Sequence, residues 1–288
     1  MSKYFYLIAG LPDVALEDSK ISYSVEEFNE EIYPYLSKKD KKIIDIYFLK
    51  YDNENVLNLL KDDSYPINDR GLFSAQELLH YISIIKEAIQ DEEIIKIKEK
   101  DFPSYLVRFI SDYYLEENEA KKTDVYLEDY LSVLYYNYAM SCKNKFVASW
   151  YEFNLNLKNI LIALSGRRYK MDVTTNILGE NSIAKALRTS TVRDFGLSEE
   201  FEYVEELLKV DEMNQLTDRE KRIDELRWLW MEDATLTDYF TIERLLVFLI
   251  KIDTIERWNL LDKEKGSHLF RGIIDTLKNE VQIPKEFK

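Results

Sequence analysis

Apolar side chains recur three and four residues apart along much of this 288-residue chain, which is the spacing of one face of an α-helix. The pattern is clearest in residues 74–89, 126–142 and 146–164. A fourth segment, Ile242 to Ile252, is apolar at nearly every position. It is too short and too charged to span a bilayer, so it predicts a central, buried helix.

Short polar motifs suggest where the helices begin and end. A Ser or Thr followed three residues later by Glu is typical of a capping box, and it occurs at Ser24/Glu27, Ser74/Glu77 and Thr217/Glu220. Gly166 is placed to follow a helix in the left-handed conformation. Residues 61–71 and 167–181 are the expected long loops, and Tyr4 to Ala9 fits either a strand or a helical turn.

Composition supports an all-α fold. The chain has 7 Gly and 5 Pro, and residues 104–283 contain no proline, as long helices require. Tight hairpins and phosphate-cradling loops both need Gly at positive φ, so neither can be common. We expect residues 1–288 to form a single, elongated helical unit.

The net charge of −15 limits the classes of partner that the chain is expected to bind. An acidic surface repels phosphate backbones and anionic lipid, so neither nucleic acid nor direct lipid binding is expected. Cys142 is the single cysteine, which fits a reducing compartment, and the short apolar run near the N-terminus resembles neither a leader nor a membrane span. A cytoplasmic location follows by default.

A weak internal repeat joins two helical segments. Residues 52–61 and 156–164 both contain Asp or Asn, then two residues, then Asn, a β-branched residue and Leu. The pattern places Asp52 and Asn55 in correspondence with Asn156 and Asn159, and a looser third copy begins at Asp253. Asn55 and Asn159 are expected near the beginnings of corresponding helices, with Asp52 and Asn156 one turn earlier as caps. Two such matches can also arise by chance in a helical chain.

The chain carries no recognisable catalytic, metal or nucleotide motif. Its two histidines are His80 and His268; Glu77 and His80 match one half of a di-iron helix motif, but no second half occurs. No glycine-rich phosphate loop or nucleophile elbow is present. We therefore expect no catalysis, no cofactor, no metal and no small-molecule substrate.

The most basic cluster of the acidic chain runs from Arg167 to Lys170. Its cations either stabilise the negative end of a helix or grip an acidic partner. Arg167 and Arg168 are the candidates for partner contact.

The repeat residues resemble a recurring motif in the C-type stalk subunits of V-type rotary ATPases, which are called d-type in eukaryotes. The first copy is Asp52-x-x-Asn55-Val56, and the region from Trp150 to Asn159 and the helix at 246–258 resemble the second and third repeats of that family. The opening Tyr4 to Pro12 and the phrase Leu161 to Lys170 also resemble an uncharacterised bacterial family associated with V-type ATPase gene clusters. Asn156 replaces the usual Asp, and the third copy lacks the Asn.

The resemblance implies a funnel-like helical body with three pseudo-repeats that sits between a rotating shaft and a membrane ring. It implies a non-catalytic coupling subunit, held at the periphery of the inner membrane by the shaft and ring subunits. A generic helical adaptor or assembly factor is the alternative. A helical enzyme whose carboxylate site is not marked by any sequence motif is the second alternative.

Overall fold

The computed structural model describes residues 4–18, 22–115 and 124–261. In this part of the chain 67% of the residues are helical and no strand occurs, which confirms the all-α prediction. The chain divides into two compact units, residues 37–234 and residues 1–36 together with 235–288. A single body of residues 1–288 therefore stays a prediction.

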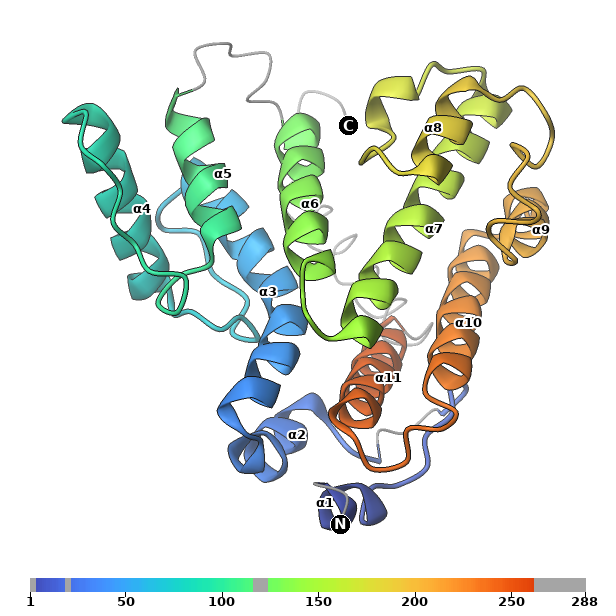
Figure 1. Ribbon diagram of the computed structural model, residues 1–288, viewed down its shortest axis with the longest axis horizontal. Coiled ribbons are helices and arrows are strands. Elements are labelled where there is room, and N and C mark those ends of the chain that lie inside the picture. Colours follow the sequence, from blue (N-terminus) through green and yellow to red (C-terminus); the bar gives the residue numbers. More distant parts are fainter. Residues whose placement is uncertain (1–3, 19–21, 116–123, 262–288) are drawn as a thin grey trace, which may run out of the picture. The chain divides into compact units, whose positions relative to one another are not determined.

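The larger unit contains eight α-helices among its described residues (Figure 1). They are α3 (Lys38–Lys61), α4 (Ala75–Gln90), α5 (Ser104–Leu115), α6 (Asp124–Met140), α7 (Lys145–Tyr169), α8 (Ser182–Thr189), α9 (Val204–Glu212) and α10 (Leu216–Ala234). Helices next to each other in sequence pack together, α4 on α5, α5 on α6 and α6 on α7. Helix α7 also contacts α8, α9 and α10, so it is the central helix of this unit.

Aromatic rings fill the space between α7 and α10. Trp230 of α10 lies 5.5 Å from Trp150 and 5.2 Å from Phe153 between ring centroids, and Phe146 adds a third contact at 5.6 Å. Such ring pairs contribute beyond the area they bury. The predicted apolar face of residues 146–164 is therefore the face that packs in the core.

Two buried tyrosines tie three helices together. The hydroxyls of Tyr135 on α6 and Tyr151 on α7 both donate to the carbonyl of Ile46 on α3, at 2.7 and 3.2 Å, and lie 2.7 Å from each other. Burial raises the pKa of both phenols, so both stay protonated donors. This network fixes α3 against α6 and α7.

The smaller unit contains α1 (Phe5–Ala9), α2 (Val25–Glu31), the 3₁₀ turn η1 (Tyr33–Tyr35) and α11 (Ile242–Leu260). The first of these resolves the ambiguity at Tyr4 to Ala9 in favour of a helix. The predicted buried helix at Ile242 to Ile252 is confirmed, because most of the side chains of α11 are buried. Helix α2 packs against α11.

Two of the three capping boxes are confirmed, and two helix ends were wrongly predicted. The side chains of Ser24 and Ser74 each accept from the backbone N–H three residues on. The side chain of the matching Glu accepts in turn from the backbone N–H of the serine. Thr217 is not a cap, because α10 already begins at Leu216. Gly166 does not end α7, which runs on to Tyr169 and is capped by Lys170 at φ 55°.

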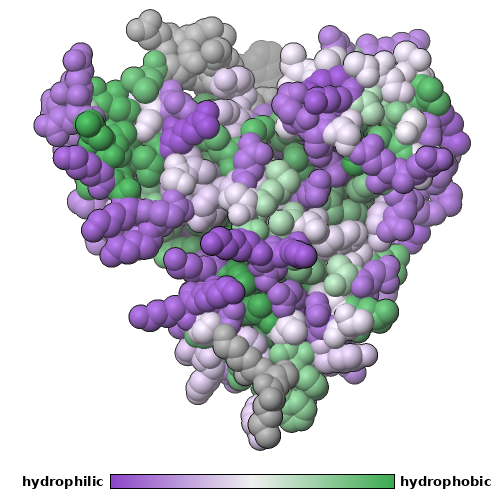
Figure 2. All heavy atoms as spheres, in the orientation of Figure 1, coloured by the Kyte–Doolittle hydropathy of each residue, from purple (hydrophilic) through white to green (hydrophobic). Residues whose placement is uncertain are grey.

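Within the described residues, no helix has both the length and the apolar content to cross a membrane. Figure 2 shows hydrophilic residues along the outer edges of α4 and α9, with hydrophobic ones where α4 faces α5. Helix α4 packs on α5, and its buried residues are Leu78, Ile82 and Ile85.

Candidate functional site

Asn55 is buried on α3 and binds the loop that follows this helix. Its side-chain amide donates to the carbonyl of Asn68 at 3.0 Å, and its side-chain oxygen accepts from the N–H of Asn68 at 2.7 Å. An Asn side chain can satisfy both backbone groups of one residue in this way. The pair of bonds fixes the loop on the helix thirteen residues after Asn55.

Asp52, one turn earlier and fully buried, holds the end of the same loop. Its two carboxylate oxygens accept from the N–H groups of Leu72 at 2.9 Å and Phe73 at 3.2 Å. Gly71 comes so close that a Cβ there would lie 2.5 Å from a carboxylate oxygen. Burial raises the pKa of Asp52 to about 6, although the two N–H donors oppose the shift.

Asn159 on α7 makes the same reciprocal bonds as Asn55. It donates to the carbonyl of Leu178 at 2.7 Å and accepts from the N–H of Leu178 at 2.8 Å. Asn156, one turn earlier, accepts from the side chain of Asn181 at 2.8 Å. Asn181 is in turn the N-cap of α8.

The two polar pairs therefore have the same role: each fixes, on a long helix, the connection to the next helix. The pair on α3 holds the segment before α4, and the pair on α7 holds the segment before α8. Their expected place near the beginnings of helices was wrong, since α3 begins at Lys38 and α7 at Lys145. Short acceptors serve here as anchors inside a helix rather than as its caps. Whether the pairs stem from an internal repeat stays a prediction.

Asp253 lies in the smaller unit, buried on α11. One turn further on, Glu256 is also buried and accepts from the N–H of Val25 at 2.8 Å. Val25 is the first residue of α2. A carboxylate on a long helix thus binds the start of another helix in this unit as well.

Arg167 and Arg168, proposed as partner contacts, are both engaged within the chain. Arg167 donates to the carbonyls of Ser190, Val192 and Arg193, and its guanidinium lies 3.5 Å from the ring centroid of Phe195. Arg168 pairs with Asp211 of α9 at 3.2 Å. These bonds stabilise the segments after α7, and a contact with a partner stays a prediction.

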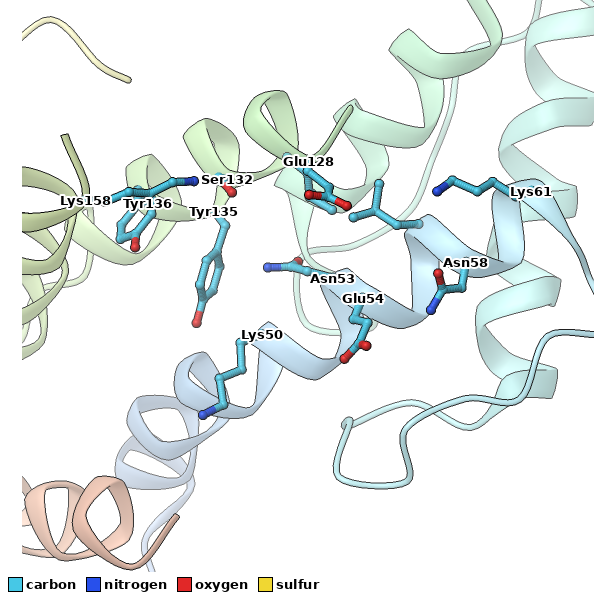
Figure 3. Close-up of a pocket in the computed structure, with 12 residues that line it drawn as sticks. Lys50, Asn53, Glu54, Asn58, Lys61, Glu128, Ser132, Tyr135, Tyr136 and Lys158 are labelled. Atoms are coloured by element: carbon cyan, nitrogen blue, oxygen red, sulfur yellow. The ribbon is translucent and has the colours of Figure 1, made fainter. Parts of the chain in front are cut away.

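A groove of about 420 Å³ runs between α3 and α6 (Figure 3). Leu57 and Leu131 contribute its apolar part. The polar residues around them are Lys50, Asn53, Glu54, Asn58, Lys61, Glu128, Ser132, Tyr135, Tyr136 and Lys158. Lys158 lies 3.5 Å from Asp129, so this lysine is already paired.

The chemistry available in this groove is that of a mixed polar surface. Its two glutamates are accompanied by three lysines, and neither His nor Cys lines it. Among the described residues, no three His, Cys, Asp or Glu side chains converge as they would around a metal. His80 is exposed and lies beside Tyr81, while His268 lies outside the described residues.

A family model for a protein of unknown function, DUF2764, matches residues 1–281. The chain belongs to the DUF2764 family. Neither the curated proteins nor the solved structures contain a significant match to it.

The sequence analysis did not identify three of the residues that make these contacts in this DUF2764 chain. Asn68 and Asn181 are the loop partners, and Glu256 is the anchor on α11. Glu256 follows Asp253 at the same spacing that separates Asp52 from Asn55, so a search allowing Glu at the second position would have found it. The loop partners carry no comparable signal.

Proposed function

We propose that this protein is a non-catalytic coupling subunit of a V-type rotary ATPase, which joins the soluble shaft to the ring of membrane helices. The proposal rests on the resemblance of Asp52 to Lys61 and of Asn156 to Leu164 to the repeats of the C-type stalk subunits. The observation that carries it is the shared role of Asn55 and Asn159, which bind a loop peptide in the same reciprocal way. A body built from repeated helical units is expected to use equivalent residues equivalently.

The physical demands of coupling agree with this geometry. A torque coupler must transmit force without local unfolding, and connections between helices are the parts that open first. In this chain buried side chains fasten those connections, so that opening one exposes unpaired polar groups. Stiffness at the connections is what the proposed role requires.

Attachment to the membrane is proposed to run through proteins. The net charge of −15 opposes adhesion to anionic head groups. The protein would then lie in the cytoplasm at the inner membrane, bound to the shaft and ring subunits and needing no cofactor of its own. A generic helical adaptor for another complex is the alternative.

Two measurements on the full chain test the proposal. The purified protein should not co-float with phosphatidylglycerol vesicles, yet a tagged copy should recover ATPase shaft and ring subunits from gently solubilised native membranes. Recovery of a different complex would establish the generic adaptor instead. Strong flotation with vesicles alone would contradict attachment through proteins.

A further inference from the structure

Aromatic rings gather in the smaller unit where α1 meets the turn that precedes α11. The ring of Phe5 lies 4.8 Å from that of Phe240 and 5.4 Å from that of Tyr6, measured between centroids. Figure 1 shows α1 beside this turn, which runs from Thr235 to Thr241. The contact between Phe5 and Phe240 therefore joins two distant parts of the sequence at one surface.

The side chains around this contact are largely open to water. The exposed fractions are 84% for Tyr6, 71% for Leu236, 69% for Tyr239 and 45% for Phe5. An aromatic side chain buries about 150–250 Å² when covered, so these four side chains present on the order of 400 Å². One exposed apolar side chain is ordinary, but a patch of this size often marks an interaction site. We call Phe5, Tyr6, Leu236 and Tyr239 the aromatic patch.

The carboxylates near the aromatic patch have no cation to balance them. Asp238 lies within the turn, and Asp13 is exposed shortly after α1. Neither makes an ion pair with any described residue. The described cation nearest to the turn in sequence is Arg244, which donates to the hydroxyl of Thr235 at 3.3 Å and is thus engaged within the chain.

The same sign of charge prevails over the described surface of the whole smaller unit. Its exposed basic side chain is Arg257, whose guanidinium lies 5.5 Å from the ring centroid of Trp258. Its exposed acidic side chains are Asp13, Glu17, Glu26, Glu27, Glu30 and Glu31. A surface with this excess of carboxylates attracts positively charged partners and repels negatively charged ones.

We propose that the aromatic patch is a docking site for a segment of a partner protein, and that this segment presents apolar side chains flanked by lysine or arginine. Tyrosine is enriched where protein partners bind most strongly, because its ring offers a large apolar area and its hydroxyl a hydrogen bond. Apolar side chains of the partner cover the rings, and its cations lie near Asp238 and Asp13. The site belongs to the smaller unit alone and stands whether or not the protein couples an ATPase.

Two other occupants fit the charges less well. A second copy of the chain would bring two acidic surfaces together, which repel each other. A membrane surface of anionic lipid is repelled for the same reason. A basic segment of another protein instead gains from the charges that surround the patch.

The test uses the full chain and an acetylated, amidated peptide that repeats leucine-leucine-lysine-lysine and carries a photo-cross-linker at one end. We expect the peptide to bind and its cross-links to fall in residues 4–13 and 235–241. A peptide of the same length with serine in place of leucine should bind at least about tenfold more weakly, since it cannot cover the rings. A peptide with glutamate in place of lysine should lose at least as much, since its charges are repelled.

Substitution of the exposed tyrosines supplies the matched control. Tyr6→Ser combined with Tyr239→Ser should weaken the leucine-lysine peptide at least about tenfold. Tyr65→Ser combined with Tyr169→Ser replaces two exposed tyrosines of the larger unit and should change the affinity less than about twofold. Asp238→Lys should weaken binding at least about threefold while leaving the rings in place. Circular dichroism should show equal helicity in all three variants.

Several results would overturn the proposal. They are an absence of binding, an equal loss in the two tyrosine variants, and equal binding of the glutamate peptide. Self-association in sedimentation that the variant at Tyr6 and Tyr239 loses would assign the patch to a second copy instead. Flotation with phosphatidylcholine vesicles that the same variant loses would assign it to a lipid surface.

Discussion

Asp52 is a carboxylate held in an apolar place by two backbone N–H groups, and its ionisation is linked to stability. Its pKa is about 6 in the folded protein, against an ordinary 3.8. Between these values the folded chain holds a proton that the unfolded chain has released. The contribution of Asp52 is therefore most favourable below pH 4 and declines as pH rises through 6.

Asp52→Asn removes this titration. The stability of the natural chain minus that of the variant should fall by about 2.5 kcal/mol between pH 4 and pH 7, because most of the shift of about two pKa units is expressed in this range. Urea unfolding of both proteins across this range measures the difference, in which the other titrating groups cancel. A difference that stays constant, or rises with pH, would contradict a pKa of Asp52 that burial raises.

Asn159→Ala leaves the N–H and the carbonyl of buried Leu178 without their partner. Two unpaired buried groups should lower the free energy of unfolding by about 2–4 kcal/mol. Asn137→Ala is the control, since Asn137 is exposed on the neighbouring helix α6, and it should change stability by less than about 0.5 kcal/mol. Equal effects in chemical denaturation would show that Asn159 anchors nothing.

The sequence indicated which polar residues have a structural role, but it did not show which contacts they make. Asp52, Asn55, Asn156 and Asn159 stood out because polar side chains recur there inside apolar helical patterns. A short acceptor near a helix suggests a cap, yet these residues are buried within their helices and bind backbone or side-chain groups 13 to 25 residues away. Such partners depend on how a loop folds back, which helical periodicity does not encode.

At the scale of the element, Gly166 shows how a local rule fails. Glycine usually marks a helix end, but this one lies inside α7, where a Cβ would clash with the methyl carbons of Val173. The chain needs the missing side chain for close packing of the returning loop, and Lys170 adopts the left-handed conformation instead. The prediction that Thr217 caps a helix was also wrong, because α10 starts before it.

Gly166→Ala should therefore destabilise the protein by about 1–2 kcal/mol, even though alanine is the better helix former. Val173→Ala removes the clashing methyl carbons, so Gly166→Ala should cost at least about 1 kcal/mol less in that background. Thermal or urea unfolding of the four proteins measures this coupling. Strictly additive effects would mean that glycine is required there for another reason.

Elements with strong periodicity were well predicted. The buried helix at Ile242 to Ile252 and the capping boxes at Ser24 and Ser74 follow from local patterns that tertiary packing leaves intact.

Across the whole molecule, polar side chains that are buried on long helices fix the connections to other helices. In the larger unit, side chains on α3 and α7 fix the connections to α4 and α8; in the smaller unit, Glu256 on α11 fixes the start of α2. Local sequence determines the helices, while these long-range bonds determine how successive helices connect. A partner is not encoded in such internal bonds, which is why the functional proposal also depends on the resemblance to the C-type stalk subunits.

We propose that this one chain joins the shaft of a rotary ATPase to its membrane ring. Cross-linking mass spectrometry on the intact ATPase, purified through a tag on one of its ATP-hydrolysing subunits, tests it most directly. We expect lysines of this chain to form cross-links to shaft subunits and to ring subunits in the same preparation. A complete, active ATPase that lacks this chain, or cross-links to neither shaft nor ring, would contradict it.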